Sequence, residues 1–193
     1  LTVGAGAIDG NASFTAGGSL ALASLTIDGD ADFTAASGGI SFDTGTIGGS
    51  AAFTSTDGNI TLANAPTVGS DLSLTTVGAG DVILPDGGIS IGGDLTVDAE
   101  DLRDADGDTD LTLAATNANI TLRDGSAARE WNTSFDQLVL AITGTGDFTL
   151  TNTDSLVLTS VTTGGNANIS TNTGNLTVGA GAIDGNASFT AGG

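Results

Sequence analysis

Short segments in which apolar and polar residues alternate recur along the whole chain. The commonest has the order small polar, apolar, polar, apolar and Thr-like residue, as in Asn11–Thr15 and Asp30–Thr34. Alternation at a period of two predicts short strands with one buried face. The central apolar residues follow one another at steps of 16 to 23 residues. They are Phe14, Phe33, Phe53, Leu74, Val97, Leu113, Leu150, Ile169 and Phe189, with Trp131 in the one gap of the series.

Two further apolar segments follow the first in most of these steps. The second is a short alternating segment, as in Ser19–Leu22 and Asn59–Leu62, and the third carries one large apolar residue such as Ile27. The third usually runs into Gly followed by Gly, Asp or Asn, and Gly supplies the positive φ that a sharp corner needs. Three short strands and three corners in about 19–20 residues predict a right-handed parallel β-helix, a β-solenoid with nine turns in 175 residues.

The two alternatives to the solenoid are another all-β fold and a disordered chain. A β-sandwich or antiparallel barrel also has many short strands, but neither needs the same residue type at the same place in ten successive steps. Gly is 31 of 193 residues, which suits disorder, yet the hydrophobic 39% of the chain is regularly spaced. We therefore predict one continuous solenoid over residues 1–193. Its ten central residues, including Trp131, would form one internal ladder, and Thr15, Thr34, Thr54 and Thr75 an external row of hydroxyls.

The first eighteen residues, LTVGAGAIDGNASFTAGG, recur letter for letter as residues 176–193. We interpret residues 1–175 as one long repeat unit and residues 176–193 as the start of the next identical unit. Nine whole turns in 175 residues would bring the second copy into the helix in the same phase, with Phe189 in the place of Phe14. An open solenoid end exposes unpaired backbone and apolar surface. We therefore expect the chain to continue into another copy of itself, covalently or head to tail.

Charge excludes several classes of partner. The chain has 23 acidic residues against Arg103, Arg123 and Arg129, and its net charge is −20. Such a surface repels nucleic acid and anionic membranes. No apolar run is long enough to cross a bilayer, so we predict no membrane insertion. There is no Cys, which excludes disulfides and Cys-based metal sites.

The sequence favours a protein that is not an enzyme. Carboxylates occur at nearly every corner, so no pair stands out as a general acid and base. The chain has no His, Lys, Cys or Tyr to serve as a tuned acid or base. Arg123, Asp124, Arg129 and Glu130 form the one mixed-charge patch, which we interpret as a salt-bridged loop.

One acidic stretch has the composition of a calcium loop. Asp104, Asp106, Asp108 and Asp110 alternate around Gly107, and Ca²⁺ prefers six to eight oxygen ligands. The bidentate Glu of a helix–loop–helix calcium site is missing, because Ala115 stands twelfth from Asp104. A calcium site on the four Asp residues and a solvated acidic loop are both open interpretations. No other cofactor is expected.

The residue pattern of the repeats resembles that of a known class of large proteins. Gly92–Val97 reads GGDLTV, and residues 58–62 read GNITL. These segments resemble repeats of filamentous-haemagglutinin-type secreted exoproteins and related large bacterial adhesins, and the resemblance covers nearly the whole chain. Asp98–Asp110, a shortened turn, and Arg123–Gln137, which holds two of the three Arg residues, depart from the pattern. The resemblance implies a β-helical shaft on the cell surface or in an extracellular filament.

Two functions follow as hypotheses. The first is a structural segment of an extracellular filament built from tandem β-helical units. The alternative is an adhesin stalk or binding module that contacts cells or glycans, with calcium as a stabiliser. Outward apolar residues at Ile83, Val139 and Val157 would give such a surface an apolar strip.

Overall fold

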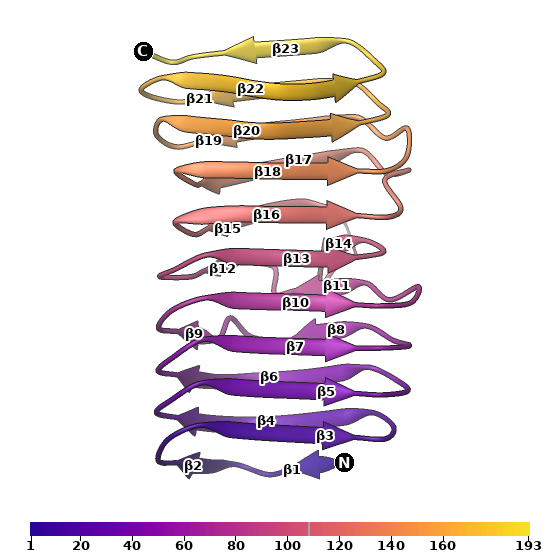
Figure 1. The fold of residues 1–193 in the computed structure, drawn as a ribbon, viewed down its shortest axis with the longest axis vertical. Helices are drawn as coiled ribbons and strands as arrows, with labels where there is room; N and C mark the ends of the chain where they lie inside the picture. Colours follow the sequence, from indigo (N-terminus) through magenta and orange to yellow (C-terminus); the bar gives the residue numbers. More distant parts are fainter. Residues whose placement is uncertain (108) are drawn as a thin grey trace.

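The computed structural model of the chain is an all-β, right-handed parallel solenoid of about nine coils (Figure 1). It describes residues 1–107 and 109–193. The alternation of apolar and polar residues along the sequence correctly predicts this fold class. Each coil forms backbone hydrogen bonds with the coils below and above it, and the N- and C-termini lie at opposite ends of the stack.

One sheet runs the full length of the solenoid and faces the viewer in Figure 1. We call it the front sheet. Within the described residues it has nine parallel strands. They are β3 (Ala12–Ala16), β5 (Ala31–Ala35), β7 (Ala51–Ser55), β10 (Leu72–Thr76), β13 (Leu95–Ala99), β16 (Asn117–Leu122), β18 (Gln137–Ile142), β20 (Leu156–Thr163) and β22 (Leu176–Ile183).

Two further parallel sheets cover the opposite side and meet midway along the solenoid. The lower back sheet, as far as it is described, contains β1 (Thr2–Val3), β2 (Gly6–Ile8), β4 (Leu20–Ile27), β6 (Ile40–Ile47), β8 (Ile60–Leu62), β9 (Thr67–Val68), β11 (Val82–Leu84) and β14 (Leu102–Asp104). The upper back sheet contains β12 (Ile89–Ser90), β15 (Asp110–Ala114), β17 (Arg129–Ser134), β19 (Phe148–Asn152), β21 (Ala167–Thr171) and β23 (Ala187–Thr190). The second and third predicted strands of a coil are joined in β4 and β6 and separate in β8 and β9.

The core lies between the front and back sheets and is filled by the inward residues of both. Phe33 and Phe53 of the front sheet and Phe42 of the lower back sheet are fully buried. The rings of Phe33 and Phe53 stack at 4.6 Å, and Phe42 meets Phe53 edge-on at 5.5 Å. Trp131 and Phe148 form a similar edge-on pair at 5.1 Å in the upper half. Aromatic side chains thus contribute to the core in both halves of the solenoid.

The lower half of the predicted internal ladder is confirmed. Phe14, Phe33, Phe53, Leu74 and Val97 are successive register partners in the front sheet. The external row of Thr residues follows the same strands, with Thr15 beside Thr34 and Thr54 beside Thr75. Parallel in-register pairing stacks like residues on like at each step.

Above Val97 the prediction of one continuous ladder is wrong. The partner of Val97 is Ile120 of β16, whereas Leu113 of β15 lies in the upper back sheet beside Ile89 and Thr133. Trp131 pairs with Leu111 instead of Leu113. A second ladder then runs up the upper back sheet through Leu111, Trp131, Leu150, Ile169 and Phe189.

The cause is the short step between Val97 and Leu113. Register partners in this solenoid are separated by 19 to 24 residues, but these two are only 16 apart. The chain after Val97 therefore reaches its next alternating segment on the back of the coil, before it has returned to the front. We call this change of face between Val97 and Leu113 the half-coil shift. It moves the repeat pattern from one face of the solenoid to the other.

The shift also overturns the predicted phase of the second eighteen-residue copy. Eight register steps in the front sheet lead from Phe14 to Gly181. Phe189 lies beyond Gly181 on the opposite side, in β23 of the upper back sheet. The second copy thus enters half a coil out of phase with the first, and Phe189 does not take the place of Phe14.

A buried amide closes one corner of the upper half. Asn152, at the end of β19, is fully buried. Its Oδ1 accepts hydrogen bonds from the Thr133 hydroxyl at 2.8 Å and the Phe135 backbone N–H at 2.9 Å. Its Nδ2 donates to the Phe135 carbonyl at 3.0 Å. The side chain therefore satisfies backbone groups that the corner leaves without strand partners.

We expect Asn152→Ala to lower the free energy of unfolding by about 2–4 kcal/mol, because both backbone groups of Phe135 would lose their partner in the core. The matched control is Asn168→Ala, an exposed residue of the neighbouring strand β21, which should change stability by less than about 0.5 kcal/mol. Urea unfolding followed by circular dichroism measures both variants. Equal losses in the two would contradict the structural role of Asn152.

Candidate functional site

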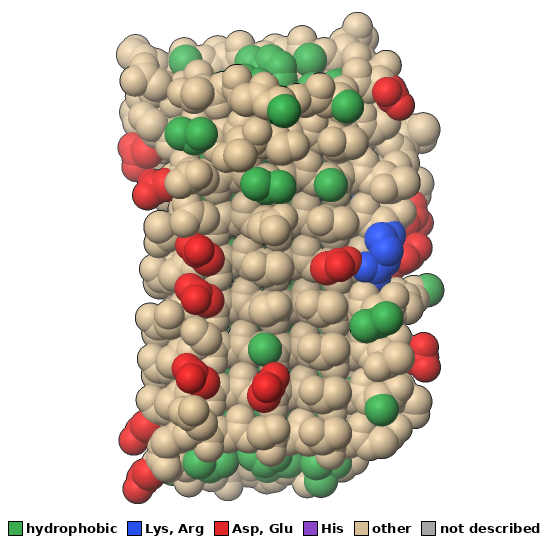
Figure 2. All heavy atoms as spheres, viewed as in Figure 1, with side chains coloured by type: hydrophobic (Ala, Val, Ile, Leu, Met, Phe, Trp, Pro, Cys, Tyr) green, Lys and Arg blue, Asp and Glu red, His purple; other side chains and the backbone are tan. Residues whose placement is uncertain are grey.

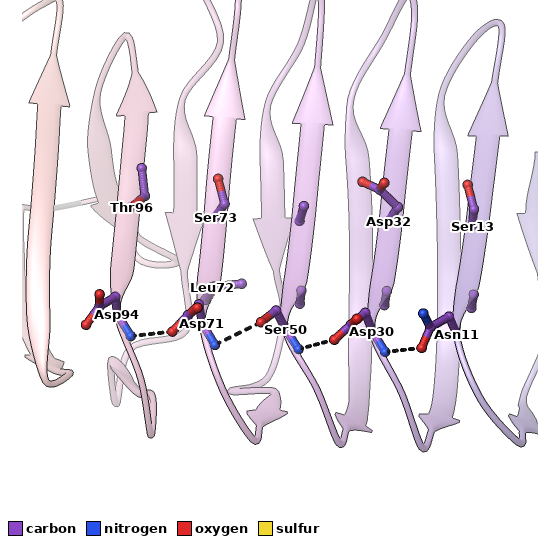
Figure 3. A pocket seen from close by; sticks show the side chains of 14 residues that line it. Asn11, Ser13, Asp30, Asp32, Ser50, Asp71, Leu72, Ser73, Asp94 and Thr96 are labelled. Atoms are coloured by element: carbon purple, nitrogen blue, oxygen red, sulfur yellow. Dashed lines mark hydrogen bonds between the residues drawn. The ribbon is translucent and has the colours of Figure 1, made fainter.

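A row of polar side chains links successive coils at the start of the front strands (Figure 3). We call Asn11, Asp30, Ser50, Asp71 and Asp94 the polar ladder. The side-chain oxygen of each of the first four accepts a hydrogen bond from the backbone N–H of the ladder residue one coil above. The distances are 2.9, 2.9, 3.4 and 2.9 Å in order along the chain. Asn117 ends the row by donating its side-chain amide to Asp94 at 2.8 Å.

The polar ladder explains the recurring Gly before Asn, Asp or Ser. A Cβ on Gly29 would meet the Asn11 Oδ1, and one on Gly49 would meet the Asp30 Oδ1. Neither Gly has a positive φ, although Gly10, which precedes Asn11, has one of 105°. The prediction that a positive φ requires these corner glycines is therefore wrong at Gly29 and Gly49. At these two positions Gly is needed because a Cβ would collide with the ladder side chain. The polar ladder was not predicted from the sequence, although the repeated Gly–Asx dipeptide indicates it.

A shallow groove follows the polar ladder over strands β3 to β13. Small outward side chains, among them Ser13, Ala52 and Ser73, line it beside the ladder. Asp30, Asp71 and Asp94 lie along it and reach solvent. The groove therefore presents carboxylates and hydroxyls at intervals of one coil, and none of the three Arg residues lines it. This chemistry suits hydrogen bonding and cation attraction along a surface.

A second polar ladder with the same geometry lies on the opposite face. Asp147 Oδ1 accepts a hydrogen bond from the Asn166 backbone N–H at 3.1 Å, and Asn166 Oδ1 accepts one from the Asn186 N–H at 2.8 Å. These residues precede strands of the upper back sheet, where they line a smaller groove. Asn186 is the copy of Asn11 in the repeated eighteen residues. The two ladders thus use the same sequence element on opposite faces.

Arg123 connects three successive coils just above the half-coil shift. Its guanidinium forms an ion pair with Asp98 of the coil below, and its Nε lies 3.6 Å from the Glu100 carboxylate. One terminal nitrogen donates to the carbonyl oxygens of Thr76 and Gly78, two coils below Arg123. The side chain therefore joins the last regular front coils to the first coil beyond the shift.

The other two Arg residues also form ion pairs with the coil below them. The Arg129 side chain is 1% exposed, pairs with Asp101, and donates to the carbonyls of Ala127 and Asp124 at 2.8 and 2.9 Å. Arg103 is 35% exposed and pairs with Asp81 at 2.7 Å. The interpretation of residues 123–130 as a salt-bridged loop needs correction, because these ion pairs lead to lower coils instead of to Asp124 or Glu130.

The predicted calcium loop lies where the half-coil shift occurs. Asp104 ends β14 and is buried, whereas Asp106 and Asp110 are exposed. All three take part in interactions within the chain. Asp108, the fourth predicted ligand, lies outside the described residues. No group of three or more His, Cys, Asp or Glu side chains in the described ranges is arranged to hold a metal ion, so calcium binding stays a prediction.

The proposed apolar strip is divided between two faces. Ile83 lies in β11 of the lower back sheet, whereas Val139 and Val157 lie in the front sheet. Val139 and Val157 are 36% and 41% exposed. They are not register partners, because Val157 lies beside Gln137. These residues therefore do not form one strip.

Comparisons with known proteins add nothing to the structural observations above. No protein-family model, curated protein or solved structure matches the chain. Nor do the described residues include a helix that is long and apolar enough to cross a membrane. Function must therefore be inferred from the ladders, the charges and the coil stacking.

We expect Gly49→Ala to lower the free energy of unfolding by about 1–3 kcal/mol, because the added methyl would displace the Asp30 carboxylate from the polar ladder. Gly17→Ala is the matched control, since a methyl at Gly17 would have no other atom within 4 Å and Gly17 has no positive φ. Thermal and urea unfolding measure the difference. A Gly49→Ala protein as stable as Gly17→Ala would show that the ladder has no spatial need for Gly.

We expect Arg129→Ala to destabilise the chain by about 3 kcal/mol, because it removes a buried charge that satisfies Asp101 and two backbone carbonyls. Arg103→Ala removes a more exposed ion pair and should cost less than about 1 kcal/mol. Both variants lose one positive charge, so net charge is matched. Equal urea midpoints for the two would contradict a special role for Arg129.

Proposed function

We propose that this chain is a shaft segment of an extracellular filament built from tandem β-solenoid units. The proposal rests on how the two copies of the repeated eighteen residues pair with their neighbouring coils. In residues 1–18, strands β1, β2 and β3 pair with the coil above, through β4 and β5. In residues 176–193, β22 and β23 pair with the coil below, through β20 and β21. The same eighteen residues thus pair with a coil above in one copy and with a coil below in the other, so a copy inside a tandem protein could pair on both sides.

The outermost coils carry the same kind of apolar side chain that stacking buries inside the solenoid. Phe33, inside the stack, is fully buried, whereas Phe189 in the top coil is 40% exposed and Val178 is 41% exposed. Figure 2 shows hydrophobic side chains gathered at both ends, with few on the face between them. Burial of these side chains under a further coil would stabilise the end by roughly 25 cal/mol per Å² of apolar surface covered.

The charge distribution favours growth along the axis. All three Arg residues are engaged in ion pairs within the chain, so the outer surface carries acidic groups without free Arg to balance them. Side-by-side contact between such surfaces is opposed by repulsion, which keeps long rods soluble. Stacking coils end to end relies on backbone hydrogen bonds and apolar ladders, which this repulsion hardly affects. An extracellular or cell-surface location agrees with the resemblance to large secreted exoproteins.

An adhesin stalk is the second candidate. The groove along the polar ladder favours it, because the groove offers carboxylates and hydroxyls at regular spacing to cells or glycans. In that case the shaft would also contribute a binding surface. Removal of outward groove residues, for example Asp32→Ala together with Ser73→Ala, would weaken adhesion and leave the rod intact. A filament with a purely structural role would be unaffected in both properties.

We expect a protein of two units, residues 1–175 followed by residues 1–193, to be a single rod longer by about 41 Å than the 193-residue chain. Each added coil should also raise stability, as nearest-neighbour stacking does in solenoids. Electron microscopy gives the length, and thermal unfolding gives the stability.

The control alters the junction alone. Replacing the internal copy of Phe14 by Asp should separate the rod into two segments with independent unfolding, because a charge would enter the ladder. Replacing the adjacent outward Thr15 by Asp should leave one rod. Two separate bodies in the unaltered two-unit protein would contradict the filament proposal.

A further inference from the structure

The two copies of the repeated eighteen residues lie on opposite faces of the solenoid. In the first copy, β1 and β2 belong to the lower back sheet and β3 to the front sheet. In the second copy, the same residues form β22 in the front sheet and β23 in the upper back sheet. Figure 1 shows this exchange, with β3 at the bottom of the front sheet and β22 at its top. The exchange is the result of the half-coil shift.

The repeat distance in coils follows from the register. Eight steps in the front sheet lead from Phe14 to Gly181, and Phe189 lies about half a coil further on. The 175-residue offset between the copies therefore corresponds to about eight and a half coils. A unit that ends half a coil out of phase starts its successor on the other face.

We infer that, in the tandem filament proposed above, each 175-residue unit is rotated by half a turn about the filament axis relative to the unit before it. The structural period is then two units, about seventeen coils and roughly 80 Å of axial length at the spacing of parallel strands. Each feature of one unit recurs on the opposite side of the next. This inference rests on the proposed function for its tandem arrangement and on the described registers for its rotation.

The internal ladders continue through such a junction. In the upper back sheet, Ile169 pairs with Phe189. In the front sheet, Phe14, which is the same residue of the repeated segment, pairs with Phe33 and stacks on it at 5.8 Å with an interplanar angle of 5°. The back ladder of one unit would therefore become the front ladder of the next without a break. Backbone pairing continues in the same way on both sides of the segment.

The polar ladders also join across the junction. Asp147 and Asn166 lead to Asn186, and its copy Asn11 leads to Asp30 and the rest of the polar ladder. The smaller groove of one unit and the larger groove of the next would form one longer groove that spans the unit boundary. It ends where the half-coil shift changes the face of the pattern. Successive grooves therefore alternate between the two faces, and both faces of the filament present the same chemistry.

The half-coil shift is tested first in the 193-residue chain, which has no Cys of its own. Thr96 and Asn119 are exposed register partners in the front sheet. Neighbouring parallel strands are about 4.8 Å apart, within the Cα separation that a disulfide spans. Thr96→Cys with Asn119→Cys should therefore form an intramolecular disulfide on mild oxidation, seen as a loss of two hydrogens by mass spectrometry.

The matched control pairs Thr96→Cys with Thr112→Cys, the partner expected if the repeat continued on one face. Thr112 is exposed in the upper back sheet, on the other side of the core, and should give no intramolecular disulfide. A disulfide in this pair and none in the first would overturn the half-coil shift and the rotation that depends on it.

The rotation is tested in the two-unit protein with Val77→Cys in each unit. Val77 is 63% exposed in the turn after β10, at the edge of the solenoid. Biotin on these thiols, bound to streptavidin, should appear in electron micrographs on opposite sides of the rod, about 41 Å apart along it. Both labels on the same side would overturn the rotation. A correct disulfide pattern in the single chain combined with no continuous rod would instead overturn the filament proposal and leave the half-coil shift standing.

Discussion

Parallel backbone hydrogen bonding between successive coils is the constraint on which the other features of this structure depend. It fixes the distance between a residue and its partner one coil away at the spacing of neighbouring strands. Side chains at coil intervals must therefore stack on one another. Phe33 on Phe53 in the core and Asp30 on Asn11 at the surface are two results of the same geometry. The absence of a side chain at Gly29 and Gly49 is a third, because the stacked polar residue occupies that space.

Backbone pairing joins a coil only to its neighbours, so this pairing does not depend on which face the repeat pattern uses. This is why the half-coil shift can be accommodated. Leu111 and Leu113 are buried in the upper back sheet as completely as their equivalents are in the front sheet. The irregular corners near the shift need other partners, and the three Arg residues of the chain provide ion pairs there. Arg123 and Arg129 in particular replace the regular polar ladder with longer connections to lower coils.

The fold class could be predicted from the sequence because burial follows the alternation directly. Phe33, Phe53 and Leu74 are buried as the pattern requires. The face on which a segment lies could not be predicted by the same means, since Asp110–Ala114 has an identical alternation on either face. Only the number of residues between Val97 and Leu113 distinguishes the front face from the back face. That number indicates a change of face only when it is compared with the length of a full coil. Asn152 was missed because it is a polar residue at an inward position of β19, and its partner Phe135 lies in a corner that has no strand pattern.

The half-coil shift and the net charge together bear on how a filament would behave. In a filament whose units all had the same orientation, the two faces would differ, and the face with the more attractive surface would associate with its like in neighbouring filaments. Alternation of the units gives both faces the same average composition, which removes that distinction. The acidic surface then repels neighbours on every side over about 8 Å at physiological salt. Contacts between coils are shorter than this and depend on apolar burial and backbone pairing, so they persist. The same sequence therefore favours extension along the axis and opposes association to the side.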